Sequence, residues 1–277
     1  MLVDLYDGDE VLKANFHCEL IATMLDTSNF HVTPWIKECI EKPLIPQRSD
    51  EWFNLRKTRI TGSMCDTILG TNRFQTRDQV VAEKAGCPVE FKGNDATQHG
   101  IDTEEKAIRL YEKKTGRSVV ELGLTQHKFI DILAHSPDGI SLKSMSDDSD
   151  GDDEPILLEI KCPYKRTIKI GKVPQYYMGQ VQLGLFVFDL KKAHFVQYKE
   201  TPYILDVTEV QRDEDWLNRN MPLFQKFWDD VKYWKNVGWK RHPYVQKSRR
   251  DILFPLGIGD LCDTQEKEEH KKQKIKI

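Results

Sequence analysis

The segments AHSPDG at 134–139 and ILLEIKCP at 156–163 decide how this chain folds. The second segment is an apolar run interrupted by an acid and a base, which predicts a short buried strand. Alternate side chains of a strand share a face, so Glu159 and Lys161 project together while the residue between them points into the core. The Ser-Pro-Asp-Gly sequence predicts a turn that leads into another strand and brings Asp138 close to this pair.

A carboxylate and an ammonium on an apolar strand cost free energy to bury unless both groups are used. Two carboxylates and a lysine are the minimum set for metal-assisted phosphodiester hydrolysis. The carboxylates hold Mg²⁺, the ion lowers the pKa of a bound water, and the lysine orients that water. Taken alone, Asp138 fits a plain turn equally well, and Glu159 with Lys161 fits an ion pair at a strand end. The combined spacing favours a nuclease site.

The composition is that of a globular protein with one large domain, or one domain with appendages. The chain has 277 residues, of which 39% are hydrophobic and 31% charged. No apolar run has transmembrane length and the N-terminus lacks a signal pattern, so an intracellular protein without membrane contact is expected. The six cysteines are scattered without a Cys-x-x-Cys pair, which disfavours a zinc ribbon or an iron–sulfur cluster.

Charge is segregated along the chain. The net charge is −3, but six acidic residues gather between 147 and 154. Without them the chain has 41 basic and 38 acidic residues, a net charge of +3. Global charge therefore does not exclude nucleic acid as a partner. The segment 144–154 predicts a solvated insertion at the tip of a hairpin between the strands of Asp138 and Glu159.

Two short helices in succession are predicted within residues 49–69. Ser49 or Asp50 caps the first helix, and Arg56 lies near its end. Backbone N–H groups and the Ser63 hydroxyl at the start of the second helix form an anion site, to which Arg56 adds a fork for phosphate. The alternative interpretation is a plain capping serine and a surface arginine.

The segment 101–115 predicts an amphipathic helix. Its apolar stripe contains Ile101, Ala107 and Tyr111, and Glu104 falls on the same stripe. A carboxylate on a buried stripe has to be hydrogen-bonded, paired or metal-bound. The alternative, given equal weight, is an acid near the helix N-terminus that the helix dipole favours.

Strands are predicted at 118–124 and 127–133, directly before the Ser-Pro-Asp-Gly turn. A helix with Pro174 in its first turn carries Tyr177 and Gln180 on one stripe, from which they could hydrogen-bond the lysine or a scissile phosphate. The alternative is a buried helix with a tyrosine hydroxyl at its edge. The remaining predicted elements are strands at 193–198 and 203–207 and a long helical region from 216 to 234.

Six motifs follow one another along the chain: Trp52-x-x-x-Arg56, Thr61-x-Ser63, Gly100-x-x-x-Glu104-x-x-Ala107, Ser136-Pro137-Asp138-Gly139, Glu159-Ile160-Lys161-Cys162-Pro163 and Tyr177-x-x-Gln180-Val181-Gln182. Their order resembles the phage lambda exonuclease family, also called YqaJ-type viral recombinases, over about residues 47–235. The resemblance implies a restriction-endonuclease-like α/β fold, with a central mixed sheet flanked by helices. It also implies two Mg²⁺ ions, with Mn²⁺ as a substitute, and digestion of double-stranded DNA from 5′ ends.

The resemblance also implies roles for individual residues. By motif position, Asp138 and Glu159 are similar to the family's metal ligands, with the Ile160 carbonyl as a third, and Glu104 is similar to the acid near the second ion. Lys161 is similar to the water-orienting lysine. The residues similar to the phosphate grip are Arg56, Thr61 and Ser63, and those similar to supporting residues are Trp52, Tyr177 and Gln180.

The family further implies a ring-shaped trimer, a single-strand annealing partner, and a role in viral recombination in the host cytoplasm or nucleus. The expected organisation is a nuclease domain at 45–240, an appendage at 1–44 and an extension at 241–277. The acidic insertion and the two additional ends depart from the family pattern and leave the trimer open. The alternatives are an endonuclease or structure-specific nuclease of this fold, or an inactive DNA-binding module, against which the intact catalytic set argues.

Overall fold

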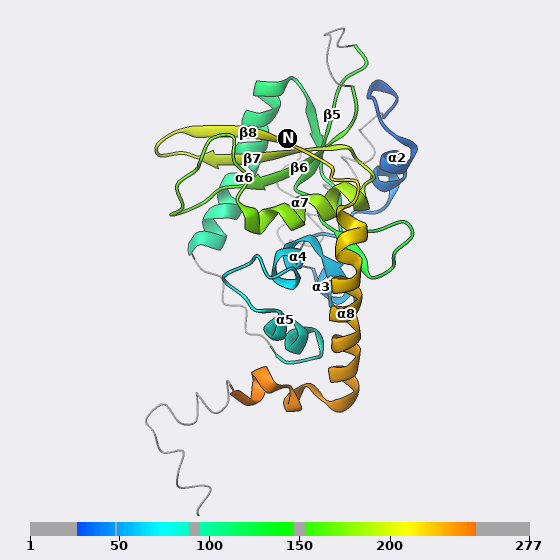
Figure 1. Ribbon diagram of the computed structural model, residues 1–277. Coiled ribbons are helices and arrows are strands. Elements are labelled where there is room, and N and C mark those ends of the chain that lie inside the picture. The colour runs from blue at the N-terminus through cyan, green and yellow to red at the C-terminus, as the bar shows by residue number, and fades with distance from the viewer. Residues whose placement is uncertain (1–26, 48, 89–94, 147–152, 248–277) are drawn as a thin grey trace, which may run out of the picture. The chain divides into compact units, whose positions relative to one another are not determined.

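The computed structural model describes residues 27–47, 49–88, 95–146 and 153–247 (Figure 1). The described residues fall into two compact units. The first unit lies within Met1–Thr76 and Glu90–Lys226, and the second lies within Arg77–Val89 and Phe227–Ile277. The ends of the predicted appendage and extension, before 27 and after 247, are outside the described residues.

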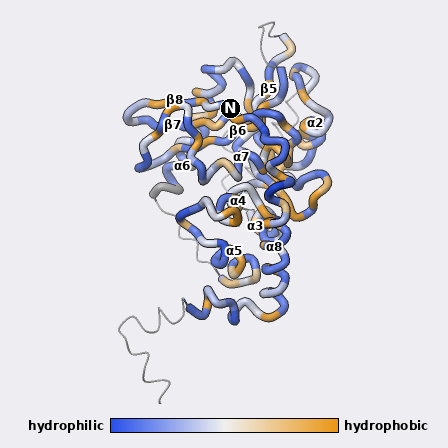
Figure 2. Tube along the Cα trace, viewed as in Figure 1, coloured by the Kyte–Doolittle hydropathy of each residue, from blue (hydrophilic) through white to orange (hydrophobic). Residues whose placement is uncertain are grey.

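A five-stranded mixed sheet forms the centre of the first unit (Figure 1). Its order is β2-β5-β6-β7-β8, in which β6 and β7 are parallel and the other neighbours antiparallel. The strands are β2 (Ser118–Val120), β5 (Gly139–Leu142), β6 (Ile156–Lys161), β7 (Lys192–Lys199) and β8 (Ile204–Gln211). The side chains of β6 are buried up to Ile160, and hydrophobic segments gather among these strands (Figure 2).

A smaller sheet contains β1 (Ile60–Thr61), β4 (Leu133–His135) and β3 (Thr125–Gln126), with β4 in the middle. β1 runs parallel to β4, and β3 runs antiparallel to it. Only residues 136–138 separate β4 in this sheet from β5 in the larger one. The Ser-Pro-Asp turn is therefore the point where the chain changes sheets.

Two helices cover opposite faces of β6. Leu158 and Ile160 share a core cluster with Ala107 and Tyr111 of α6 (Asp95–Thr115). The alternate residues of β6 face α7 (Gln175–Val187), whose Gly184 lies against Leu157. The predicted α/β fold with a mixed sheet between helices is confirmed.

The other helices of the first unit are α2 (Pro34–Glu41), α3 (Asp50–Lys57), α4 (Gly62–Ile68) and the start of α8 (Trp216–Val237), with a 3-10 turn at Thr27–Asn29. The Trp35 indole of α2 donates to the Val187 carbonyl at 3.0 Å. None of the helices among the described residues combines the length and hydropathy that a membrane crossing requires.

Two sequence predictions are wrong in this unit. Residues 127–132 form a turn, because the His127 ring accepts hydrogen bonds from the backbone N–H groups of Phe129 and Ile130 at 3.1 and 3.2 Å. The strand starts only at Leu133. Ile101 is 38% exposed and does not belong to the buried stripe of α6.

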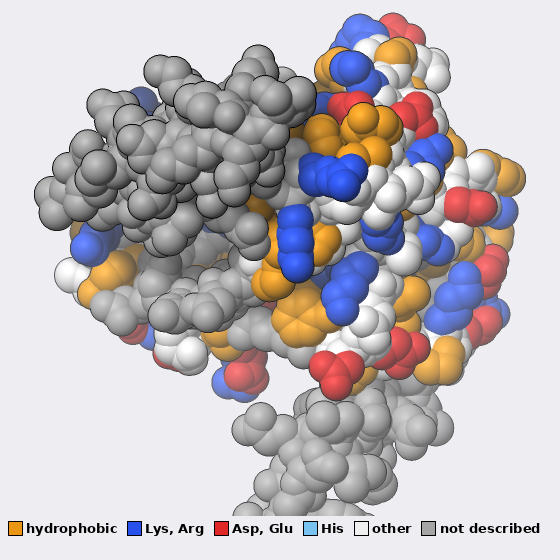
Figure 3. Space-filling model, turned by 90° about the horizontal axis from the view of Figure 1, so that it is seen from below, with side chains coloured by type: hydrophobic (Ala, Val, Ile, Leu, Met, Phe, Trp, Pro, Cys, Tyr) orange, Lys and Arg blue, Asp and Glu red, His pale blue; other side chains and the backbone are white. Residues whose placement is uncertain are grey.

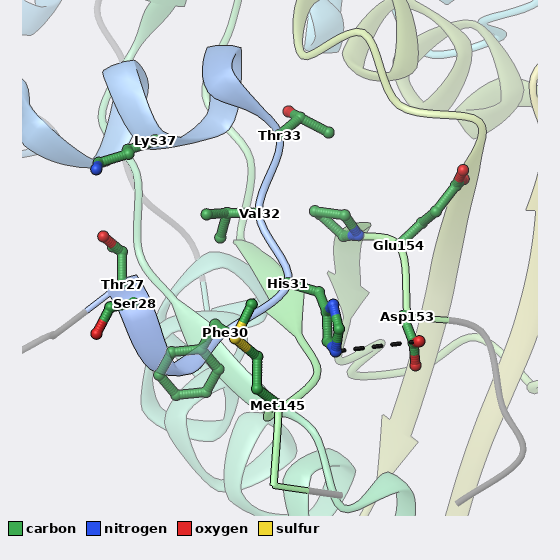
Figure 4. Close-up of a pocket in the computed structure, with 11 residues that line it drawn as sticks. Thr27, Ser28, Phe30, His31, Val32, Thr33, Lys37, Met145, Asp153 and Glu154 are labelled. Atoms are coloured by element: carbon green, nitrogen blue, oxygen red, sulfur yellow. Dashed lines mark ion pairs between the residues drawn. The ribbon is translucent and has the colours of Figure 1, made fainter. Parts of the chain in front are cut away.

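The acidic insertion connects β5 and β6, which pair as the predicted hairpin. The described end of the insertion, Asp153 and Glu154, is bound by two basic residues. Lys143 Nζ lies 2.7 Å from Asp153, and Arg117 donates to the Glu154 carbonyl at 2.6 Å. Beside these residues lies a pocket that is lined by Phe30, Met145 and the His31–Asp153 pair (Figure 4). The pocket therefore combines apolar walls with an acid–histidine pair.

The second unit contains α5 (Arg77–Lys84), the part of α8 from Phe227, and a 3-10 turn at Trp239–Arg241. Arg77 pairs with Asp230 at 2.6 Å, and its guanidinium lies 5.7 Å from the centre of the Phe227 ring. These contacts join α5 to α8.

The packing of α7 on β6 predicts opposite outcomes for two glycine-to-alanine changes. A Cβ at Gly184 would lie 2.6 Å from Leu157 Cδ2, so Gly184→Ala should lower the free energy of unfolding by about 1–3 kcal/mol. A Cβ at Gly100 of α6 meets nothing within 4 Å, so Gly100→Ala should raise it by up to ~1 kcal/mol. Urea denaturation of both variants checks this, and equal stability of the two would contradict the packing.

Candidate active site

The centre of the candidate site is the end of β6. The Glu159 side chain is 0% exposed, and Lys161 lies beside it on the same face of the strand. The Lys161 ammonium hydrogen-bonds Glu159 Oε1, donates to the Ile160 carbonyl at 3.0 Å and lies 3.8 Å from Asp138 Oδ2. Asp138, Glu159 and the Ile160 carbonyl, three of the four groups that the resemblance assigned to metal ions, therefore lie around one cationic nitrogen.

The turn between β4 and β5 brings Asp138 to this nitrogen. Its Oδ2 accepts a hydrogen bond of 2.6 Å from the backbone N–H of Ile160. Because the turn residue is bonded to the neighbouring strand, the two carboxylates keep a fixed separation. The sequence prediction that the turn lies beside the Glu159–Lys161 pair is confirmed.

Burial and neighbouring charges have opposite effects on the pKa values of Glu159 and Lys161. Burial raises the pKa of the Glu159 carboxyl, and the Lys161 charge acts in the opposite direction. Burial also lowers the pKa of the Lys161 ammonium, but Glu159 and Asp138 outweigh burial and hold this pKa above its usual value. Lys161 is therefore a fixed positive charge at neutral pH.

Helix α7 contributes the residues that the sequence placed on one stripe. Gln180 Nε2 donates to Glu159 Oε1 at 2.5 Å. The ring of Tyr177 lies 5.4 Å from the Lys161 ammonium, so the tyrosine meets the lysine through its π face and not through the predicted hydroxyl bond. Both residues are at the site, as expected.

Asp66 of α4 holds α7 in place, and the sequence analysis missed it. Its buried carboxylate accepts hydrogen bonds of 3.1 Å from the backbone N–H groups of Gly179 and Gln180. Burial raises the pKa of Asp66, against the hydrogen bonds that lower it. An acid within the short segment 64–69 is the only signal in the sequence, and it does not reveal a partner more than a hundred residues away.

Glu104 lies half-buried on α6. Burial is the main cause that raises the pKa of Glu159, and the Glu104 charge adds to it, so the two carboxyl groups lie within electrostatic range.

A second cluster contains the predicted phosphate grip. Arg56 Nη2 donates to Ser63 Oγ at 2.9 Å, and its guanidinium lies 4.2 Å from the centre of the Trp52 ring. Ser49 caps α3, as predicted, by accepting from the Trp52 N–H. Burial lowers the pKa of Arg56 to about 10, so the guanidinium is charged at neutral pH. Thr61 differs from the prediction because its side chain is buried and makes no capping bond at the start of α4.

His135 is a residue that the sequence analysis missed. Its imidazole is 1% exposed, its Nε2 lies 3.7 Å from Glu159 Oε2, and neither ring nitrogen has a hydrogen-bond partner among the described residues. Burial, together with the charges of Lys161 and Arg56, lowers its pKa to about 3. The ring therefore stays neutral between the two clusters. A histidine just before the Ser-Pro-Asp-Gly turn was the available signal.

The donor set suits a hard cation. Two carboxylates and a carbonyl are oxygen ligands of the kind that hold Mg²⁺. In this structure the same three groups lie around the Lys161 ammonium. Within the described ranges, no three His, Cys, Asp or Glu side chains form a group of metal-binding geometry. Two of the three proposed donors are carboxylates and the third is the Ile160 carbonyl, so the fit to a divalent ion rests on the type of these oxygen donors.

Comparison with known families decides what this chain is. Residues 51–191, more than half of the chain, match the YqaJ-like viral recombinase domain. The chain belongs to this family. The predicted recognition of a YqaJ-type recombinase is confirmed.

Curated relatives of this YqaJ-like chain include viral and bacterial proteins. It is 29% identical over 167 residues to the uncharacterized protein R354 of Acanthamoeba polyphaga mimivirus, covering 58% of this chain and 30% of that protein. It is 30% identical over 171 residues to protein D345L of African swine fever virus, covering 53% of this chain and 48% of that protein. Bacillus subtilis YqaJ is 26% identical over 188 residues, covering 65% of this chain and 56% of YqaJ. The chain thus spans between about a third and somewhat over half the length of these relatives.

Solved structures confirm the restriction-endonuclease-like fold. The alkaline exonuclease LHK-Exo from Laribacter hongkongensis has a TM-score of 0.56 at 24% identity, covering 74% of this chain and 100% of that one. The structure of LHK-Exo in complex with dAMP has the same TM-score at 26% identity, covering 69% of this chain and 99% of that one.

The contact between Asp66 and α7 predicts a stability effect. Asp66→Asn replaces one acceptor oxygen by a donor, which removes one of the two hydrogen bonds from α7 and sets two N–H donors against each other. It should lower the free energy of unfolding by about 1–3 kcal/mol. Asp215→Asn, at an exposed aspartate, should change it by less than about 0.5 kcal/mol. Chemical denaturation of the two variants measures both, and a neutral Asp66→Asn would refute the contact.

Proposed function

We propose that this YqaJ-like chain is a metal-dependent deoxyribonuclease that digests linear duplex DNA from its 5′ ends in viral recombination or repair. The observation that carries the proposal is the fully buried Glu159, which shares the Lys161 ammonium with Asp138 and the Ile160 carbonyl. The likeness to an alkaline exonuclease supports the same reaction class.

Each residue at the end of β6 has a role in this reaction. Asp138, Glu159 and the Ile160 carbonyl would hold Mg²⁺, or Mn²⁺ in its place. When bound, the ion supplies a water of lowered pKa and offsets charge on the phosphate. Lys161, a fixed positive charge, orients the attacking water and stabilises the negative charge that develops on the phosphate oxygens.

Residues on the flanking helices support this centre. Gln180 fixes Glu159 Oε1 through its amide, and Tyr177 limits the movement of the lysine through its ring. Glu104 faces the same centre from α6 and is assigned to the neighbourhood of a second ion. These contacts keep the charged groups in one arrangement before DNA arrives, which lowers the reorganisation needed during reaction.

The Arg56 cluster is the proposed grip on a DNA phosphate. The Trp52 ring packs on one side of the guanidinium and Ser63 bonds one of its nitrogens, so the fork is oriented in advance. On the face that Figure 3 shows, Lys and Arg side chains lie among hydrophobic and acidic ones. A ring-shaped trimer, a single-strand annealing partner and the compartment stay predictions of the family resemblance.

The function is tested with DNA of the same sequence in linear and in closed circular form. We expect Mg²⁺-dependent release of nucleotides from the linear duplex, no cleavage of the circle, and loss of release on chelation with EDTA. Cleavage of the circle would favour the endonuclease alternative. Binding of linear DNA without any cleavage would favour an inactive DNA-binding module.

Glu159→Gln should nearly abolish cleavage, because it removes the negative charge that binds the ion while keeping the shape of the side chain. The expected loss is about a hundredfold or more in the single-turnover rate, with DNA affinity retained. Glu209→Gln is the matched control, since Glu209 also lies beside a histidine, His194, at 4.0 Å, but on β8, in register with Leu158 on the opposite face of the sheet. Mg²⁺-dependent cleavage rates close to wild type in Glu159→Gln would contradict the assignment of Glu159 to the active site.

Arg56→Ala should slow digestion of 5′-phosphorylated duplex more than that of 5′-hydroxyl duplex. A charge-assisted phosphate contact contributes roughly 1.5–3 kcal/mol, so a loss on the order of ten- to a hundredfold is expected. Arg59→Ala is the control, because Arg59 lies three residues away and bonds Gln126. Circular dichroism verifies folding. An equal loss on both substrates would assign Arg56 to a different phosphate.

A further inference from the structure

His135 occupies a space that two glycines create. It is the last residue of β4, and its ring lies between the start of α4 and the middle of α7. A Cβ at Gly62 would overlap its Nδ1 and Cε1 atoms, and a Cβ at Gly184 would lie 2.8 Å from its Nε2. The imidazole is therefore held on both sides and has little room to turn.

The same Nε2 atom also lies beside the second oxygen of Glu159. Oε1 of Glu159 already accepts from Lys161 and Gln180, whereas Oε2 is buried and accepts from no group among the described residues. His135 Nε2 lies 3.7 Å from this oxygen and has no hydrogen-bond partner among the described residues either. A buried carboxylate oxygen without a donor costs free energy, so an N–H at this place has a clear function.

The imidazole suits the role of a hydrogen-bond donor and not that of a general acid or base. An imidazole carries a hydrogen on at least one of its ring nitrogens. With hydrogen on Nε2, the ring has a donor 3.7 Å from Glu159 Oε2, a few tenths of an ångström beyond hydrogen-bond range. Since the ring is 1% exposed, it has no access to a substrate phosphate.

We propose that His135 is a positioning residue for Glu159, whose Nε2–H donates to Oε2 and so orients the carboxylate toward a divalent ion. The inference rests on the proposed function, because it concerns a metal-holding role of Glu159. Ligand side chains in metal sites are oriented by such outer hydrogen bonds, and their loss typically weakens metal affinity by about ten- to a hundredfold.

Three substitutions separate a hydrogen-bonding role from a packing role. His135→Gln places an amide N–H close to the position of Nε2. His135→Met has the same length and no donor, and His135→Asn places its amide close to the position of Nδ1. The full chain is titrated with Mn²⁺ by calorimetry without DNA, and thermal unfolding of the metal-free chain is measured in parallel.

We expect the glutamine variant to bind Mn²⁺ nearly as the wild type does, and the methionine and asparagine variants to bind about ten- to a hundredfold more weakly. In single-turnover digestion at limiting Mg²⁺, the methionine variant should lose rate, with an unchanged KM for DNA. Higher Mg²⁺ should restore part of that rate.

Two outcomes would overturn the inference. A methionine variant that binds Mn²⁺ like the wild type, with only a lower unfolding temperature, would reduce His135 to packing. Equal weakening in the glutamine and methionine variants would mean that a donor at Nε2 is not the requirement. A wild-type chain that binds no Mn²⁺ and digests no DNA would instead refute the proposed function, and the role of His135 with it.

Discussion

A carboxylate with no exposure to solvent, next to an ammonium on a central strand, is the constraint on which this structure depends. Taking Glu159 and Lys161 out of water is costly, and only surrounding polar groups can offset that cost. The fold supplies them from several elements. A turn brings Asp138, the strand brings its own Ile160 carbonyl, and α7 brings Gln180. The architecture can be understood as the arrangement that lets these groups meet while the other face of β6 packs on α6.

Close packing on the Glu159 face is possible because helix positions that meet the site carry little or no side chain. Gly184 admits Leu157 and the imidazole, and Gly62 admits the imidazole from the opposite side. Asp66 then fixes the spacing between the two helices through backbone N–H groups, which does not depend on which side chains α7 carries. Rigid helices therefore hold the polar groups at the end of β6.

Local patterns in the sequence were sufficient where the relevant residues are close in the chain or share one element. Alternation along the strand predicted that Glu159 and Lys161 share a face, and the capping pattern predicted that α3 begins at Ser49 or Asp50. The roles of the site residues stay predictions. The contacts of His135 and Asp66 were missed, because each joins segments whose proximity arises only when two sheets and two helices assemble. The prediction of a strand at 127–133 was wrong because of a side-chain contact. The His127 ring accepts hydrogen bonds from backbone N–H groups of the following turn, and these bonds replace strand pairing.

The change of sheet at residues 136–138 has a mechanical consequence. β4 belongs to the sheet that is continuous with α4, and β5 belongs to the sheet that holds β6, so Asp138 lies on a three-residue joint between two blocks. Under the proposed function, a displacement of the α4 block by bound DNA would act on Asp138 through this joint. A phosphate bound at Arg56 and an ion bound at Asp138 and Glu159 would then be coupled, and thermodynamic reciprocity would require each to change the affinity for the other by the same factor.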